Sequence, residues 1–168
     1  MFQKLLGLIK IKALMITINV IVNNNYWYSS IKNPDNYIAR KINRINKFEK
    51  IYFKKKIYCT LLLSGNKEIK YLNNKFRKKN LSTDVLSFPF QPKKELNNLL
   101  KSEKEIYLGD IIINLNKIEK KNLNSFKSEF DRLWIHGFLH LFGHDHKNEK
   151  DFLKMKQVEK KYLDLINA

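Results

Sequence analysis

Cysteine, glycine and proline are scarce in this chain of 168 residues, which contains one, five and three of them. A single cysteine cannot form an internal disulfide, which excludes a disulfide-stabilised scaffold and favours a reducing compartment, the cytoplasm. The sequence has no internal repeat and no Gly/Ser-rich linker, and its length suits one domain of ~100–200 residues. A chain of this length buries roughly 70% of the surface that it exposes when unfolded, so it needs no disulfide.

Long apolar stretches are also absent. The longest uncharged stretch, residues 13–31, has an apolar part of 10 residues, 13–22, whereas a membrane-spanning helix needs ~20. We therefore expect no membrane partner. Lysines precede this stretch, as in a signal peptide, but no small-residue cleavage site follows it. The alternation of apolar residues from Ile16 to Val22 with Thr17 and Asn19 favours a strand instead.

Acidic residues are few, with 16 against 33 basic residues and a formal net charge of +17. Lysine supplies 29 of the basic residues and arginine 4, in a composition typical of AT-rich coding DNA, so part of this charge belongs to ordinary solvated surface. Residues 1–56 carry 12 basic and 2 acidic residues, and residues 57–168 carry 21 and 14. Both parts attract polyanions, which makes nucleic acid the leading partner class and an unengaged basic surface the alternative.

Hydrophobic periodicity predicts an α+β fold in which a mixed sheet of about four strands is covered by helices. The expected strands are residues 15–22, 57–63, 84–90 and 107–114, and the expected helices are residues 31–45, 66–78, about 125 onward and 148–166. In the first of these helices, Asn33 is the expected cap and Pro34 stands at the first position. Residues 91–106 are expected to form a loop or a short helix. Residues 15–168 would form a single domain, and residues 1–14 are either an extra N-terminal segment or precede a true start at Met15.

The sequence also predicts the environment of two single residues and the composition of two helix faces. Gly109, inside a strand, indicates a bulge or a close backbone approach, and Cys59 is expected to be a core residue. On the helix at 66–78, Ile69, Leu72 and Phe76 are expected to share one face. The buried side of the helix at 148–166 is expected to carry Phe152, Met155, Val158, Tyr162 and Leu165.

All four histidines lie within the 11 residues 136–146. His136 and His140 would share one helix face about 5–6 Å apart, and Gly143 suits the left-handed residue that ends a helix. The following turn would bring His146 round as a third ligand. Three imidazoles at ~2.0–2.1 Å leave a fourth position for water, as in catalytic zinc sites, where the pKa of that water falls toward ~7.

Two alternatives to a catalytic zinc site use the same histidines. They could be ordinary core or surface residues of a helix, but three at this spacing with glycine at the turn make that interpretation the weaker one. The zinc could also be purely structural, which the lack of nearby cysteine ligands disfavours. His144, the fourth histidine, falls in the turn as a surface residue or a group beside the ligands. Asp145 could orient an imidazole, accept a proton, or be only a turn carboxylate.

The spacing H-x3-H-x2-G-x2-H is that of the metzincin proteases. Those enzymes need a glutamate directly after the first histidine as the general base, and this chain has Gly137 there. A zinc peptidase would therefore lack its proton acceptor, which disfavours that function.

Three stretches, in the same order, resemble the YbeY family of metal-dependent endoribonucleases of bacterial ribosomal RNA maturation. Residues 136–146 resemble its H-G-x-L-H-L-x-G-x-D-H signature. Residues 72–77 and 82–89 resemble its LN-x-x-[YF]-R and [PS]-T-D-V-L-S-F-P stretch, and residues 108–111 its L-G-D-[IV] strand. The chain departs from the family pattern at His144, where tyrosine is usual, and at Asn80, where aspartate is usual.

The resemblance implies a mixed sheet under helices and one zinc ion held by His136, His140 and His146. It also implies a hydrolase that cleaves single-stranded RNA, matures the 3′ end of small-subunit ribosomal RNA and acts in ribosome quality control. The expected partners are ribosomal RNA and the small ribosomal subunit, with no small-molecule cofactor. The resemblance further implies a role for Arg77.

The residue type of Arg77 independently indicates a functional role. It is one of only 4 arginines, and a guanidinium can bind a phosphate through two donors where lysine acts as a point charge. The alternative is an arginine in a surface ion pair. Lys75, Lys78 and Lys79 beside it are expected to hold the RNA backbone. Thr83 and Asp84 either cap a turn beside the site or begin a strand.

The reaction has two forms that the sequence does not separate. A metal-activated hydroxide could attack phosphorus directly, or the ribose 2′-hydroxyl could attack while the metal or Arg77 stabilises the developing charge. Two other function classes stay open, a zinc hydrolase of peptides or small molecules and a ribosome assembly factor that keeps zinc for stability.

Overall fold

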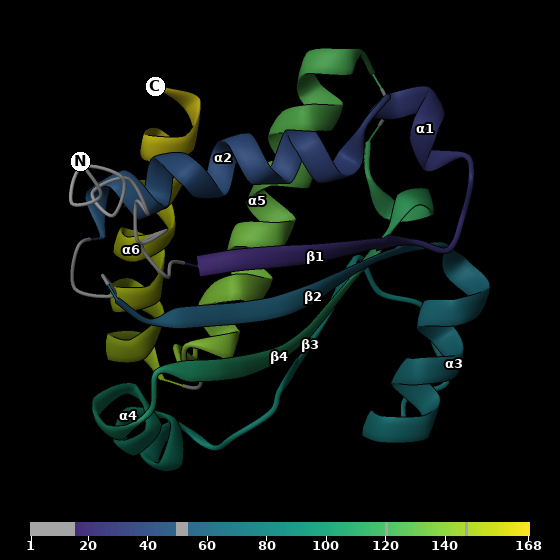
Figure 1. Cartoon of the computed structure of the whole chain (residues 1–168). Coiled ribbons are helices and arrows are strands. Elements are labelled where there is room, and N and C mark those ends of the chain that lie inside the picture. The colour runs from purple at the N-terminus through teal and green to yellow at the C-terminus, as the bar shows by residue number, and fades with distance from the viewer. Residues whose placement is uncertain (1–15, 50–53, 120, 147) are drawn as a thin grey trace, which may run out of the picture.

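A computed structural model describes residues 16–49, 54–119, 121–146 and 148–168 (Figure 1). The expected segment 1–14 lies outside these residues. The elements run in the order β1 (Ile16–Val22), α1 (Trp27–Ser30), α2 (Pro34–Phe48), β2 (Lys56–Ser64), α3 (Asn66–Arg77), β3 (Val85–Pro89), α4 (Lys93–Ser102), β4 (Glu105–Asn114), the short 3-10 helix η2 (Leu115–Lys117), α5 (Leu123–Leu141) and α6 (Glu149–Asn167). The predicted α+β class is confirmed.

The four strands form one mixed sheet in the order β1-β2-β4-β3. β1, β2 and β4 are parallel, and β3 pairs with β4 in the antiparallel direction. β3 is therefore one of the two edge strands of the sheet. It contacts α5.

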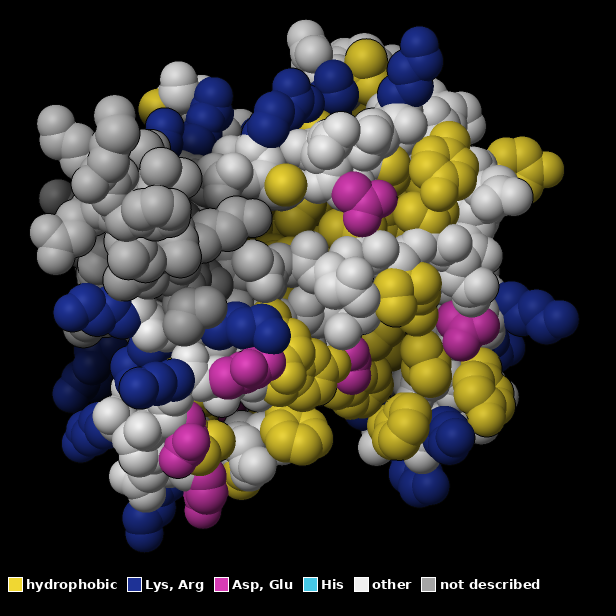
Figure 2. Space-filling model, in the orientation of Figure 1, with side chains coloured by type: hydrophobic (Ala, Val, Ile, Leu, Met, Phe, Trp, Pro, Cys, Tyr) yellow, Lys and Arg dark blue, Asp and Glu magenta, His cyan; other side chains and the backbone are white. Residues whose placement is uncertain are grey.

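Helices cover the two faces of the sheet unequally (Figure 1). α2 and α5 pack on one face, and α6 packs against both of these helices. On the other face, Ile69 of α3 forms a small cluster with Leu86 and Ile112. A cavity of about 460 Å³ lies there between α3 and the strands, and hydrophobic side chains gather over this region beside α3 in Figure 2.

A buried polar group fixes α5 in the core. Asp131 is 2% exposed, and its carboxylate accepts hydrogen bonds from Tyr37 Oη at 3.0 Å and Trp134 Nε1 at 2.9 Å. Lys41 Nζ lies 2.7 Å from the same carboxylate. A buried carboxylate is tolerated because such partners replace water, so α2 and α5 are held in one relative position.

The bulge expected at Gly109 is confirmed. Tyr58 pairs with Tyr107 but Thr60 pairs with Asp110, so two residues of β4 lie opposite one residue of β2. Gly109 has φ +129°, and a Cβ there would lie 2.1 Å from the carbonyl oxygen of Phe88. Only glycine accommodates both this conformation and this approach.

Most other expectations for the elements are confirmed. Cys59 is buried, residues 93–102 form the short helix α4, and Asn33 caps α2 with Pro34 in first position. The helix therefore begins at Pro34 rather than at Ile31, and the short helix α1 was not expected.

Two aromatic side chains on the apolar faces of helices are exposed, and the expectation that Phe152 is buried was wrong. Phe76 is 58% exposed and Phe152 is 49% exposed. Phe76 lies in the last turn of α3, where its ring packs edge-on against Phe88 instead of the core. Phe152 lies in the first turn of α6, and Lys156 extends over its outer surface. Within the described ranges, no helix is long and apolar enough to cross a membrane.

Candidate metal centre

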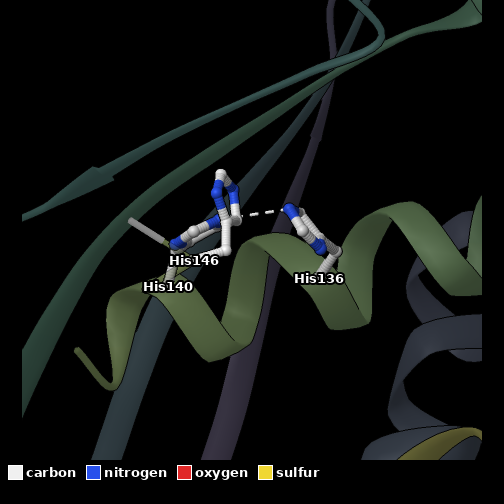
Figure 3. A group of neighbouring side chains, drawn as sticks. All are labelled: His136, His140 and His146. Carbon is white, nitrogen blue, oxygen red and sulfur yellow. Dashed lines mark hydrogen bonds between the residues drawn. The ribbon is translucent and has the colours of Figure 1, made fainter. Parts of the chain in front are cut away.

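Two histidines come from the last turns of α5 and the third from the turn that follows. Gly143 has φ +78°, its N–H donates to the carbonyl of His140, and the N–H of His144 donates to the carbonyl of Leu139. This pair of hydrogen bonds is the Schellman ending of a helix, for which a left-handed glycine is the usual residue. The chain then reverses and brings His146 to the face that carries His136 and His140 (Figure 3).

The three side chains can reach one ion. One ligand atom from each of His136, His140 and His146 lies within 4.8 Å of the others, and the Nε2 atoms of His136 and His140 are 3.1 Å apart. Two nitrogens at this separation can both reach a zinc ion at ~2.0–2.1 Å. The donor set, three imidazoles and no cysteine, is also that of an open zinc site.

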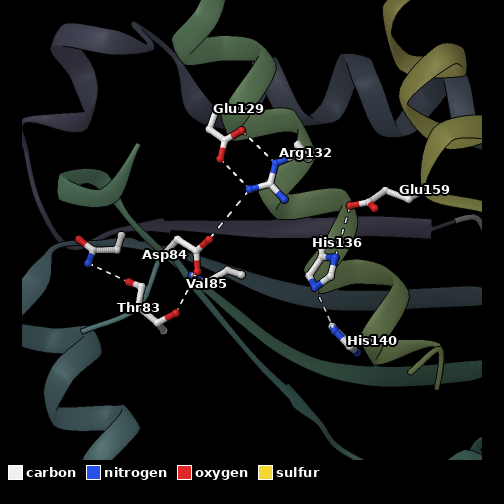
Figure 4. A network of polar contacts seen from close by, with 9 residues as sticks. Thr83, Asp84, Val85, Glu129, Arg132, His136, His140 and Glu159 are labelled. Atoms are coloured by element: carbon white, nitrogen blue, oxygen red, sulfur yellow. Dashed lines mark hydrogen bonds and ion pairs between the residues drawn. The ribbon is translucent and has the colours of Figure 1, made fainter. Parts of the chain in front are cut away.

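Polar contacts at the Nδ1 atoms of His136 and His140 leave their Nε2 atoms as ligands. His140 Nδ1 lies 2.9 Å from the carbonyl oxygen of His144, and His136 Nδ1 lies 3.3 Å from Oε1 of Glu159 on α6 (Figure 4). Both acceptors favour a proton on Nδ1, so the Nε2 lone pairs face each other. This arrangement is repulsive unless a cation lies between them, which is the chemistry of a metal site.

Burial keeps His140 in the form that binds a metal. Desolvation, followed by the charge of His136, lowers the pKa of His140 below its ordinary value. Metal ligation requires the neutral imidazole, so the environment of His140 favours binding at neutral pH.

Gly137 directly follows the ligand His136 on α5 and packs against the sheet. A Cβ at this position would lie 2.7 Å from Cγ2 of Ile111 and 3.0 Å from Oγ of Ser87. The position where a metzincin carries its glutamate is therefore filled by the sheet and has no room for a longer side chain.

Arg77 shares one cavity of about 670 Å³ with two of the three grouped histidines, His140 and His146. Arg77 is exposed at the end of α3 and donates from Nη2 to the carbonyl of Ser87 at 3.0 Å, and its guanidinium lies 5.7 Å from the ring centre of Phe88. The cavity is lined by Arg77, Ser87, Pro89, Gln91, Pro92, Lys93, His140, Gly143, His144, Asp145, His146 and Asp151. The structure thus brings together Arg77 and the histidine group, which are far apart in the sequence.

The two other residues of the histidine turn also line this cavity. Asp145 is half-buried and accepts a hydrogen bond from the backbone N–H of His146 at 2.8 Å, a local contact that shapes the turn. His144 contributes its carbonyl to His140, while burial and then Lys93 lower the pKa of its imidazole. The group of side chains that can hold a metal contains the other three histidines.

The lysines predicted to bind RNA lie beside Arg77 but outside the cavity. Lys75, Lys78 and Lys79 are all exposed. Lys75 extends over the ring of Phe76 at 5.3 Å, and Lys78 ends α3 with φ 58°. They form a basic margin next to Arg77.

Thr83 and Asp84 lie directly before β3, which begins at Val85. Asp84 Oδ1 accepts hydrogen bonds from Thr83 Oγ1 and from the backbone N–H of Val85, the first residue of β3. Its other oxygen lies 4.0 Å from Arg132, which is bound by Glu129 (Figure 4).

Sequence reasoning missed Glu159 and Ser87. Each reaches the site only through tertiary packing, Glu159 from α6 and Ser87 from the edge strand. No local pattern distinguishes Glu159 from the other acidic residues of its helix.

Comparison with known proteins agrees with the histidine pattern. The family model described as "Endoribonuclease YbeY" matches residues 21–167. The chain belongs to the YbeY endoribonuclease family. An Endoribonuclease YbeY of Pelagibacter ubique is 44% identical over 151 residues, which are 86% of this chain and 92% of that protein. Another, from Buchnera aphidicola, is 36% identical over 154 residues, covering 89% and 92%.

A solved structure also resembles this YbeY-family chain. The solution structure of TM1509 from Thermotoga maritima has a TM-score of 0.50 and 25% sequence identity, and the match covers 90% of this chain and 89% of that one. The family assignment makes the chain an RNA-cleaving hydrolase by relationship, and the resemblance drawn from the sequence motifs is confirmed.

Proposed function

We propose that this chain is a zinc-dependent endoribonuclease of the cytoplasm that cleaves single-stranded RNA, matures the 3′ end of small-subunit ribosomal RNA and acts in ribosome quality control. The observation that carries the proposal is that two of the three grouped imidazoles, those of His140 and His146, line one cavity together with Arg77. Relatives named as endoribonucleases support the reaction class. A net charge of +17 suits ribosomal RNA and the small ribosomal subunit as partners.

His136, His140 and His146 would hold the zinc ion. When bound, zinc supplies a Lewis acid that offsets developing negative charge and lowers the pKa of a water molecule to ~7. The protein fixes the ligands for this purpose through the Schellman ending of α5 and through the acceptors at two Nδ1 atoms.

Arg77 would bind the phosphate of the scissile bond. Its hydrogen bond to the Ser87 carbonyl and its position over Phe88 fix the plane of the guanidinium. Nη2 alone is used in that hydrogen bond, and the other donors of the guanidinium remain to contact phosphate oxygens. Because charge builds up on these oxygens in the transition state, a fixed cation there stabilises it without reorganisation.

Asp145 and the lysines have supporting roles in this proposal. The carboxylate of Asp145 lines the cavity and would accept a proton there during the reaction. Lys75, Lys78 and Lys79 would hold the RNA backbone beside Arg77, through contacts that weaken as salt rises.

The experiment that tests the function compares wild type with His140→Ala on a labelled single-stranded RNA. A folded His140→Ala variant that no longer cleaves supports a catalytic zinc. If the variant unfolds and the wild type never cleaves RNA, zinc has a structural role and an assembly factor without catalysis replaces the enzyme. Cleavage of casein by the zinc-loaded wild type would indicate a peptidase, for which Gly137 leaves no glutamate base.

A further inference from the structure

We propose that Glu159 is a positioning residue of the metal centre. Its carboxylate accepts the N–H of His136 Nδ1 and so presents Nε2 of His136 to the metal. This inference deepens the proposed function and rests on it in one respect, that the three histidines hold a zinc ion.

The position of Glu159 is unusual for a carboxylate on a surface helix. It lies on α6, next in sequence to Val158, which packs against the core, and its side chain is 18% exposed. Oε1 is buried and has no hydrogen-bond partner in the described part of the chain apart from this imidazole contact at 3.3 Å. Burying a carboxylate oxygen costs free energy unless a donor satisfies it, and the N–H of His136 is the donor that this geometry offers.

The neighbouring cation Arg132 interacts with Glu159 through its charge but makes its hydrogen bonds to Glu129, so it does not replace the imidazole contact. Arg132 lies one turn before His136 on α5, but Glu129 holds its guanidinium through two hydrogen bonds at 2.9 and 2.6 Å. Figure 4 shows the consequence: Arg132 points toward Glu129 and Asp84, and His136 stands between Glu159 and His140.

The two helix histidines are therefore oriented in different ways. His140 donates to a backbone carbonyl, that of His144, which no side-chain substitution removes. His136 depends on a side chain from a different helix. The tautomer and ring orientation of His136 therefore depend on Glu159, a side chain that a substitution can remove. Through this contact the packing of α6 affects the metal site. Loss of such a partner typically weakens metal binding about 10- to 100-fold.

Two substitutions separate the parts of this role. In Glu159→Gln the amide oxygen can still accept the N–H, but the charge is lost, so zinc affinity should fall toward the lower end of that range, about 10-fold. In Glu159→Leu no acceptor remains, and the loss should approach about 100-fold. Asp164→Asn is the matched control, because Asp164 is exposed on the same helix and its substitution removes the same charge.

The zinc dissociation constant of each full-length variant is measured by competition with a chromophoric chelator, without RNA. Thermal melting of the metal-free proteins checks that all variants fold. Long-range 1H–15N spectra of the zinc-loaded proteins report the tautomer of His136, and we expect a protonated Nδ1 in wild type whose signal shifts or disappears in Glu159→Leu. A merely structural role for Glu159 would change melting but not the tautomer.

The outcomes distinguish this inference from the function that it deepens. Equal zinc affinity in wild type and Glu159→Leu, with an unchanged His136 signal, overturns the role of Glu159 and leaves the nuclease untouched. A wild-type chain that binds no zinc overturns both. If zinc binding depends on Glu159 but the wild-type protein cleaves no RNA, the role of Glu159 is supported and the proposed catalytic function is rejected.

Discussion

Arg77 Nη2 donates to the backbone carbonyl of Ser87 across 3.0 Å, which ties the end of α3 to the edge strand of the sheet. Ser87 lies on β3, the strand against which α5 packs. The hydrogen bond therefore holds an arginine from one side of the sheet at the rim of a cavity whose histidines come from the other side. From this fixed position Arg77 can contact a substrate that lies beside the histidines.

Arg77→Ala should lower the single-turnover rate of RNA cleavage about 100-fold, the typical loss when one fixed stabiliser of transition-state charge is removed. Arg77→Lys should recover only part of the rate, because an ammonium restores the charge but not the fork of donors. Arg40→Ala, a substitution of another exposed arginine, is the control and should leave the rate unchanged. Equal rates for Arg77→Ala and Arg40→Ala would remove Arg77 from the site.

Gly137→Ala should lower the free energy of unfolding by about 1 kcal/mol. The new methyl group meets Cγ2 of Ile111, and overpacking a core costs about 1–3 kcal/mol, offset in part by the better helix propensity of alanine, about 1 kcal/mol. Urea unfolding measures the change. Ile111→Ala removes the obstructing atom, so the double variant should lose less stability than the sum of the single variants. A Gly137→Ala protein as stable as wild type would contradict this packing.

Neutralising Lys75, Lys78 and Lys79 with glutamine should weaken RNA binding and reduce its salt dependence. For single strands, each lysine that no longer neutralises a phosphate lowers the slope of log affinity against log salt by about 0.7. Fluorescence anisotropy of the metal-free protein, which should not cleave, measures that slope. The control replaces three other exposed lysines, Lys47, Lys101 and Lys117, with the same change in net charge. If both triple variants change the slope equally, the RNA binds through the overall positive charge of the protein and not specifically through Lys75, Lys78 and Lys79.

Removing the metal should leave the fold intact but lower the melting temperature. The main core does not include the three ligands, so the metal-free chain has its own hydrophobic stabilisation. A bound ion at 1,000 times its dissociation constant adds about 4 kcal/mol. Far-UV circular dichroism and melting curves with and without chelator test this expectation. Loss of helical signal on chelation at 25 °C would assign the metal a structural role.

The histidine geometry could be predicted from the sequence because it is local. The i, i+4 spacing on α5 and the left-handed Gly143 determine where His136, His140 and His146 point, whatever packs around them. Gly109 was predictable for the same reason, since glycine inside a strand marks a special backbone position.

The contacts made by Glu159 and Ser87 could not be predicted in this way. Both depend on how separate elements pack, and neither residue stands out in its own segment. Phe76 and Phe152 illustrate the same limit, because helical periodicity identifies an apolar face but not where a helix extends beyond the surface that it covers. The exposed fractions of 58% and 49% reflect the positions of these residues near helix ends.

The central claim, that the three histidines and Arg77 form one zinc-dependent nuclease site, has a direct test. Purified protein is analysed for metal and incubated with a labelled single-stranded RNA, with and without chelator, and the ends of the fragments are identified. We predict one equivalent of zinc and cleavage that chelator abolishes and zinc restores. A 2′,3′-cyclic phosphate would indicate attack by the ribose hydroxyl, and its absence would indicate attack by water. Cleavage that continues undiminished after all metal has been removed would contradict the claim.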